Sequence, residues 1–102
     1  MILYNVTVNI DDSVHDEWLG WMKRIHIPEV MNTGLFIENK ICRVLGDDPS
    51  GTTYSIQYLC SSMAVFNDYQ KNFSGALQKK HSDKYEGKYV AFRTLLEVIH
   101  HQ

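Results

Sequence analysis

The amino-acid sequence predicts a single α+β domain whose elements follow one another in the order β-α-β-β-α-β. Runs of alternating or β-branched residues predict four strands, and two segments with apolar residues three and four positions apart predict two helices. The chain has 102 residues, of which 44% are hydrophobic and 22% charged, as in one globular domain. We therefore expect residues 1–102 to form one domain, with 99–102 as a flexible tail.

Residues 2–10 predict a strand with one buried face, because their apolar residues recur at every second position. That face carries Ile2, Tyr4, Val6, Val8 and Ile10, and the other carries Leu3, Asn5, Thr7 and Asn9. Asp11, Asp12 and Ser13 follow, and each can cap the N-terminus of a helix.

From Val14 the apolar period becomes helical. The stripe that we expect to be buried is Val14, Trp18, Trp21, Ile25 and Pro28, with His15, Leu19, Met22, His26 and Val30 along its flank. Because Pro28 has no N–H and crowds the carbonyl of Arg24, we expect a kink there. The helix should end near Asn32–Thr33–Gly34, a typical stop signal.

Residues 35–45 and 52–60 predict two strands of a hairpin, joined by the polar turn 46–51. Ser61 or Ser62 caps a second helix, whose apolar stripe is Phe66, Tyr69, Phe73, Ala76 and Leu77. Residues 89–98 predict the fourth strand. This order is that of the ferredoxin-like split-βαβ arrangement, a four-stranded antiparallel sheet with both helices on one face.

The sheet face away from the helices is expected to be polar but mostly uncharged. Its residues include Leu3, Asn5, Thr7, Asn9, Thr53, Ser55, Gln57 and Leu59, with Arg43 and Arg93 contributing in a register that the sequence leaves open. Solvated surfaces are usually rich in Lys and Glu, so this composition favours a half-buried interface or a pocket lining. We expect a second copy of the chain to cover this face; a bare face on a monomer is the alternative.

His26 and Arg93 are the candidates for chemistry. His26 lies two residues before Pro28, where it could act as a general base near neutral pH or serve a structural role. Arg93 interrupts an apolar strand, so it needs a carboxylate partner, often across an interface, or an acidic ligand. Cys42 and Cys60 are expected to pack as small apolar residues.

Several classes of function are disfavoured. The net charge of −2 argues against nucleic acid and anionic membranes as partners, and no apolar run is long enough to cross a bilayer. No phosphate-binding glycine loop, nucleophile elbow or zinc-protease motif occurs. We expect no cofactor and no metal, since His26 and Glu29 lack a second ligand pair and two cysteines cannot form a zinc site. The cysteine content fits a reducing, cytoplasmic location.

Four blocks of the sequence also resemble a known family: Tyr4–Val8, Glu17–Val30 with Gly34, Thr53–Tyr58 and Val90–Leu96. The chain is similar to a bacterial family called domain of unknown function 4286, within the dimeric α+β barrel group. The resemblance covers nearly the whole chain and implies a homodimer whose two sheets form a barrel with a pocket in each half. It implies no activity and no catalytic residues.

The wider group resembles a collection of cofactor-independent monooxygenases, isomerases and ligand sensors, and several members share a His-x-Pro step like His26–Pro28. Three functions therefore remain open. The chain is a homodimer that binds a small organic or anionic ligand inside the barrel, with Asn5, Thr7, His26, Gln57 and Arg93 lining the pocket. Alternatively it is a cofactor-independent enzyme with His26 as general base, or a structural interaction module without a ligand.

Overall fold

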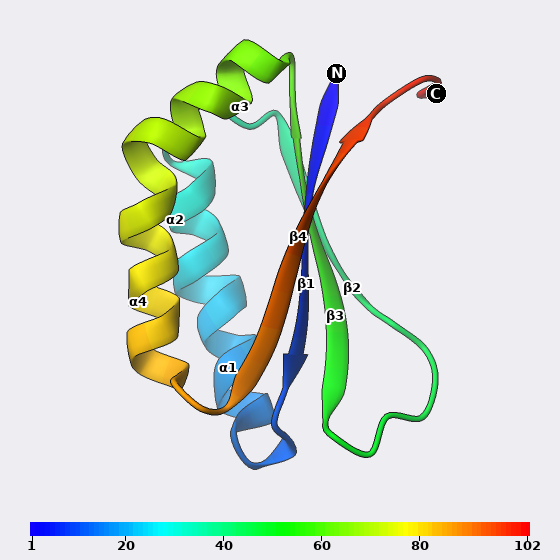
Figure 1. Ribbon diagram of the computed structural model, residues 1–102, viewed down its shortest axis with the longest axis vertical. Helices are drawn as coiled ribbons and strands as arrows, with labels where there is room; N and C mark the ends of the chain where they lie inside the picture. Colours follow the sequence, from blue (N-terminus) through cyan, green and yellow to red (C-terminus); the bar gives the residue numbers. More distant parts are fainter.

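The computed structural model describes all 102 residues and shows a layer of helices on one face of a four-stranded antiparallel sheet (Figure 1). The strands are β1 (Ile2–Ile10), β2 (Glu38–Arg43), β3 (Thr52–Cys60) and β4 (Tyr89–Glu97), in the spatial order β2-β3-β1-β4. β1 pairs with β3 on one side and with β4 on the other. The predicted α+β, ferredoxin-like arrangement is confirmed.

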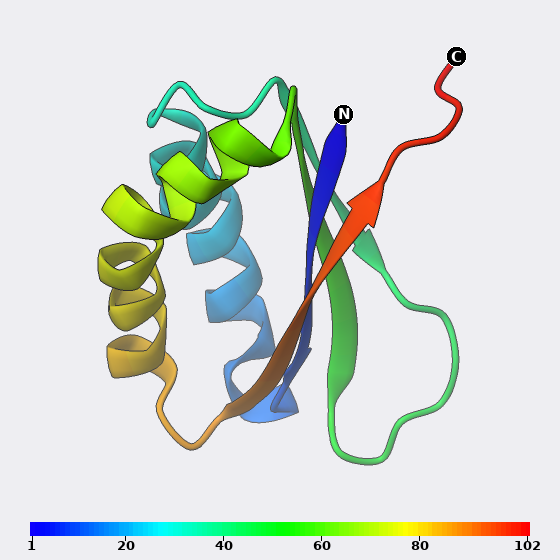
Figure 2. The same ribbon diagram turned by 45° about the horizontal axis from the view of Figure 1, so that its top comes forward.

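Each of the two predicted helices is present as a helical arm made of several segments (Figure 2). The first arm consists of the 3-10 turn η1 (Asp12–Val14), α1 (His15–Trp21), the π-helical segment η2 (Met22–His26) and α2 (Ile27–Met31). The second arm consists of α3 (Met63–Tyr69), the π-helical segment η3 (Gln70–Ser74) and α4 (Gly75–Tyr85). Each arm thus carries one π-helical segment in its middle.

The π-helical segments change which side chains are buried. The expected stripe of the first arm included Trp21 and Ile25, but Trp21 is half-buried and Ile25 is exposed. The buried residues are Trp18, Met22, Ile27 and Val30, because a π turn holds more residues than an α turn and rotates everything after it. In the second arm Phe73 is likewise exposed, and Leu77, His81 and Tyr85 are buried.

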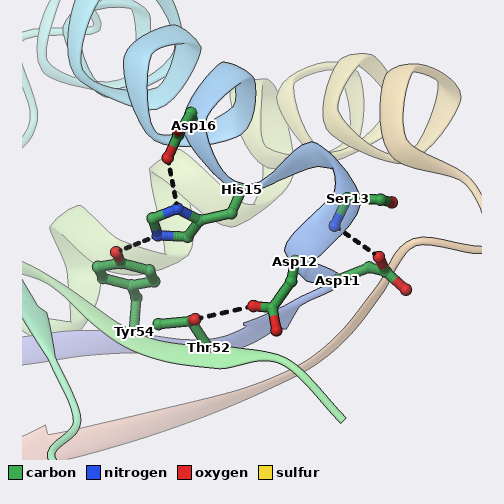
Figure 3. A network of polar contacts seen from close by, with 7 residues as sticks. All are labelled: Asp11, Asp12, Ser13, His15, Asp16, Thr52 and Tyr54. Atoms are coloured by element: carbon green, nitrogen blue, oxygen red, sulfur yellow. Dashed lines mark hydrogen bonds and ion pairs between the residues drawn. The ribbon is translucent and has the colours of Figure 1, made fainter.

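Polar contacts attach the start of the first arm to β3 (Figure 3). The imidazole of His15 lies with Nε2 2.6 Å from the Tyr54 hydroxyl and Nδ1 2.9 Å from Asp16 Oδ1, and the Thr52 hydroxyl donates to Asp12. Asp11 caps η1 by accepting from the backbone N–H of Ser13. In the second arm the cap is Ser62, which accepts from the N–H of Val65.

The observed strands correct two expectations, the length of the second strand and the burial of Cys42, and they show on which side of the sheet Arg43 lies. The strand expected over 35–45 is only Glu38–Arg43. Cys42 is exposed on β2, because it pairs with Ser55 and so shares the open face of the sheet, and only Cys60 packs in the core. Arg43 pairs with Tyr54, so it points to the helix side of the sheet.

The C-terminal residues lie beside the end of the sheet at which β1 begins and β4 ends. The N–H of Val98 donates to the carbonyl of Met1, and His101 Nε2 lies 3.9 Å from a carboxylate oxygen of Glu38. These contacts are few and exposed, and the flexibility of residues 99–102 stays a prediction.

Gly51 provides a test of the hairpin geometry. Its φ is +152°, and a Cβ built there would overlap the carbonyl oxygen of Ile10. Gly46 has a similar φ of +143° but open space around it. We expect Gly51→Ala to lower the free energy of unfolding in urea by about 2–4 kcal/mol and Gly46→Ala by only about 1 kcal/mol. Equal losses would contradict the close approach of the hairpin to β1.

Candidate functional site

A narrow cavity lies between the helical arms and the sheet, with a volume of ≈ 40 Å³. We call it the helix–sheet cleft. Its polar lining comes from both arms and from the sheet, and includes Tyr4, His26, Tyr69, Gln78, His81 and Arg93. No Asp or Glu lines it, and apolar residues complete the wall. The cleft therefore combines one cationic side chain with several neutral hydrogen-bonding groups.

His26 reaches the cleft because of the π-helical segment η2. The N–H of Ile27 donates to the carbonyl of Met22, five residues earlier, and Pro28 has no N–H with which to restore the α-helical pattern. Both ends of the segment, Met22 and His26, consequently line the cleft. The imidazole stacks on Trp21 with ring centroids 5.1 Å apart. The predicted disturbance at Pro28 thus has a positional consequence, which is to aim His26 inward.

The surroundings of His26 keep its ring neutral. Burial lowers its pKa to about 4; the Glu29 carboxylate opposes this shift, while Lys80 and Arg93 add to it. Glu29 is itself paired with Lys80 at 2.7 Å, in an ion pair that joins α2 to α4. No hydrogen bond within the chain occupies either nitrogen of His26. At pH 7 the ring can therefore accept a hydrogen bond from a bound molecule, although the lowered pKa makes it a weak acceptor of a proton.

His81 is the cleft residue that the sequence analysis missed. It is buried on α4, with its ring centroid 5.8 Å from that of His26. The indole N–H of Trp18 donates to His81 Nε2 at 2.9 Å, and burial lowers the pKa of the imidazole to about 4, with further lowering by His26 and Arg93. The signal in the sequence was its place four residues after Leu77 and four before Tyr85, on the buried stripe of the helix.

Arg93 also faces the cleft. It pairs with Val6 across β1 and β4, which places it on the helix side of the sheet and not on the open face. No carboxylate of the chain lies within ion-pair distance of its guanidinium. The expected acidic partner of Arg93 is therefore absent from its own chain, and because Arg93 is exposed on the edge strand β4, water can solvate the guanidinium.

Tyrosine hydroxyls supply further donors. Burial raises the pKa of Tyr58 and Tyr69, and that of Tyr4 despite the lowering effect of the nearby Arg93, so all three phenols stay protonated at pH 7. The side chains of Tyr58 and Tyr69 are almost fully buried, and their hydroxyls make no hydrogen bond within the chain, but neither hydroxyl is fully enclosed; the enclosed hydroxyl without a partner is that of Tyr85. These groups need partners that a bound molecule or water would supply.

The other three expected pocket residues lie on the opposite side of the sheet. Gln57 donates to Ser55, Ser55 to Asn5, and Asn5 to Thr7, over distances of 3.2, 2.5 and 3.1 Å. The side chains of this row form hydrogen bonds with one another. Asn5, Thr7 and Gln57 therefore do not share one pocket with His26 and Arg93, because the thickness of the sheet separates the two sets.

The open face of the sheet is less uniformly polar than expected. Its centre carries the row Asn5–Thr7–Ser55–Gln57, but β4 contributes Val90, Phe92 and Leu96, which are 72%, 60% and 44% exposed. These side chains form an apolar stripe along β4 that only Thr94 interrupts, which is unusual for a surface that faces only water.

The family model described as a domain of unknown function, DUF4286, matches residues 1–99. The chain belongs to this family. No curated protein matches the sequence significantly. The DUF4286 chain is similar in fold to several solved structures of low sequence identity.

One of these is HapK from Hahella chejuensis, with a TM-score of 0.72 and 9% identity over 100% of this chain and 96% of that one. A dimeric ferredoxin-like protein from an uncultured marine organism has a TM-score of 0.72 and 9% identity over 100% and 98%. A variant of SnoaB from Streptomyces nogalater, a cofactor-independent oxygenase, has a TM-score of 0.67 and 11% identity over 98% and 95%. At these identities the DUF4286 chain shares the fold with them, and its chemistry must be argued from its own side chains.

Two further features of the DUF4286 chain concern metal and membrane. The structure contains no group of three or more His, Cys, Asp or Glu side chains placed to hold a metal ion. None of its helices has the length and apolar character that a membrane span requires.

The neutral histidines make the stability of the DUF4286 fold depend on pH. Both have a folded-state pKa of about 4, below the ordinary 6.5, so the unfolded chain binds more protons between these values. Stability is therefore complete above pH 6.5 and is lost as the pH falls toward 4. We expect a loss of about 2 kcal/mol from His81 alone between pH 6.5 and 5, measured by urea unfolding.

Variants of single histidines provide the control. His81→Asn should reduce this pH dependence, whereas His100→Gln, in the exposed tail, should leave it unchanged. Equal pH dependence in the wild type and in His81→Asn would contradict a neutral, buried His81.

Proposed function

We propose that the protein is a homodimer that binds a small organic anion in the helix–sheet cleft of each chain. The observation that carries this proposal is that Arg93, an exposed side chain without an ion-pair partner, lines a cavity that has no acidic side chain. A guanidinium beside apolar walls favours a carboxylate, which it can bind through two parallel hydrogen bonds. The ligand-binding role that the sequence suggested is thus retained, but on the helix side of the sheet.

The size of the cleft restricts the ligand. A volume of ≈ 40 Å³ has room for about three water molecules, well below that of a site for a drug-sized compound. The ligand is therefore small, or the arms separate to admit a larger one. The Glu29–Lys80 pair and Leu77, which lines both the cleft and a surface groove between the arms, are the contacts that such a movement would break.

Binding of acetate and pyruvate tests the proposal. Both should shift protein resonances in NMR titrations, and acetamide, the neutral isostere of acetate, should bind at least tenfold more weakly. Arg93→Gln should weaken carboxylate binding by tenfold or more, because it removes the cation but keeps an amide of similar reach. Lys40→Gln, on the open face, is the matched control and should bind like the wild type.

Two results would oppose the proposal. Unchanged affinity in Arg93→Gln would remove Arg93 from the site. Failure of every carboxylate to bind an intact dimer would favour the alternative of a structural interaction module.

An enzyme without a cofactor is the second candidate, and the neutral, unbonded ring of His26 favours it. The resemblance in fold to SnoaB, a cofactor-independent oxygenase, is compatible with this alternative. The two functions differ in the fate of the ligand. Conversion of a bound carboxylate that His26→Gln abolishes, with binding retained, would favour the enzyme; an unconverted ligand favours a binding protein.

The second copy of the chain would cover the open face of the sheet. Support comes from the apolar stripe on β4 and from fold relatives described as dimeric ferredoxin-like proteins. Three hydrogen bonds link Asn5, Thr7, Ser55 and Gln57 to one another, which lowers the cost of burying this row against a second chain. A cytoplasmic, reducing location belongs to the same proposal, since both cysteines are free thiols.

Light scattering tests the dimer. Phe92→Glu places a charge in the proposed interface and should convert a particle of two chains into one of a single chain. Ile25→Glu, at an apolar position on the first arm that is also exposed, should leave the mass unchanged. A wild-type particle of one chain would contradict the dimer but not the anion site.

A further inference from the structure

Trp18 determines which ring nitrogen of the neutral His81 carries the proton. An indole N–H can only donate a hydrogen bond, so Nε2 of His81 must be the unprotonated, accepting nitrogen. A neutral imidazole carries one N–H, which must then be on Nδ1. The buried surroundings support the neutral form at pH 7.

The Nδ1–H of His81 has no acceptor in the chain. His81 is 8% exposed, and its only hydrogen bond is the one from Trp18. The hydroxyl of Tyr85 is the one fully enclosed side-chain atom without a partner, so Nδ1, which is also unbonded, borders open space. His81 is one of the residues that line the helix–sheet cleft.

The rings around His81 offer no substitute acceptor. Tyr89 meets the imidazole edge-on at 4.5 Å between centroids, and Trp21 and Tyr85 pack at 5.9 and 5.6 Å. No carboxylate lines the cleft. An unsatisfied buried donor beside a cavity is costly unless a bound molecule accepts from it.

We propose that His81 is a fixed hydrogen-bond donor to the anion in the cleft, and that Trp18 is the positioning residue which imposes this role. The inference rests on the proposed function, because it specifies the ligand of that same site. Arg93 supplies the charge and His81 supplies a directed N–H. The preferred ligand is therefore a carboxylate, with one oxygen accepting from Arg93 and the other from His81. His26, free on both nitrogens, adapts to whatever the remainder of the ligand presents.

Replacing His81 by Asn or by Gln distinguishes the contributions of its two ring nitrogens. The side-chain NH2 of Asn can occupy the position of Nδ1, whereas the amide of Gln reaches the position of Nε2, where its oxygen accepts from the Trp18 indole N–H and no donor is left at the position of Nδ1. We expect His81→Asn to bind acetate and pyruvate within about threefold of the wild type, and His81→Gln to bind about tenfold more weakly. Trp18→Phe, which removes the indole N–H, should also weaken binding several-fold.

Nitrogen NMR provides a readout that needs no ligand. Two-bond ¹H–¹⁵N correlations of the wild type at pH 7 should show His81 with its proton on Nδ1, and Trp18→Phe should give a mixture of the two tautomers. A proton on Nε2 in the wild type would overturn the proposal whatever the variants do.

The outcomes also separate this inference from the proposed function. Carboxylate binding that is lost in Arg93→Gln but equal in wild type, His81→Gln and Trp18→Phe would overturn the role of His81 and leave the anion site intact. Absence of carboxylate binding to the wild type would overturn both.

Discussion

Buried hydrogen-bonding groups must find partners, and those between the arms and the sheet do not find them within the chain. Tyr58, Tyr69 and His81 line the cleft, and neither the two hydroxyls nor the N–H of His81 has a partner within the chain, although none of these atoms is fully enclosed. A structural core would have paired these groups or replaced them with apolar side chains. Their convergence with Arg93 on one cavity is the physical reason to regard the cleft as a binding site.

The π-helical segments create that convergence. An unbroken α-helix from His15 to Met31 would place His26 on a different side relative to Trp18, and the two ends of the arm could not both pack on the sheet. Pro28 removes the donor that would keep the helix regular, so the sequence tolerates the extra residue at this point. The second arm has a segment of the same kind just before α4, the helix that carries Gln78 and His81.

The sheet divides the molecule into two sides with different chemistry. On the helix side, the exposed Arg93 and buried aromatic residues line a small cavity that borders the apolar core. On the open side, the side chains of Asn5, Thr7, Ser55 and Gln57 bond to one another, and β4 exposes apolar side chains that include Phe92. A surface that exposes apolar area beside polar groups bonded to one another is suited to another protein surface, whereas a cavity lined by free donors is suited to a small polar molecule.

Periodicity along the chain was sufficient to predict the order of the elements, the ferredoxin-like topology, the turn at 46–51 and the disturbance at Pro28. These features depend on residues close together in sequence, whose spacing and turn chemistry are local. The pairing of Val6 with Arg93, which turns the arginine toward the helices, depends on the register of two strands far apart in the chain. The helical phase that buries His81 and exposes Ile25 depends on where the π turns form against the sheet. The spacing of residues along the chain determines neither the strand register nor the helical phase. Only the folded chain could therefore show that His26, His81 and Arg93 line one cleft. The same holds for Asn5, Thr7 and Gln57, which lie on the opposite face of the sheet.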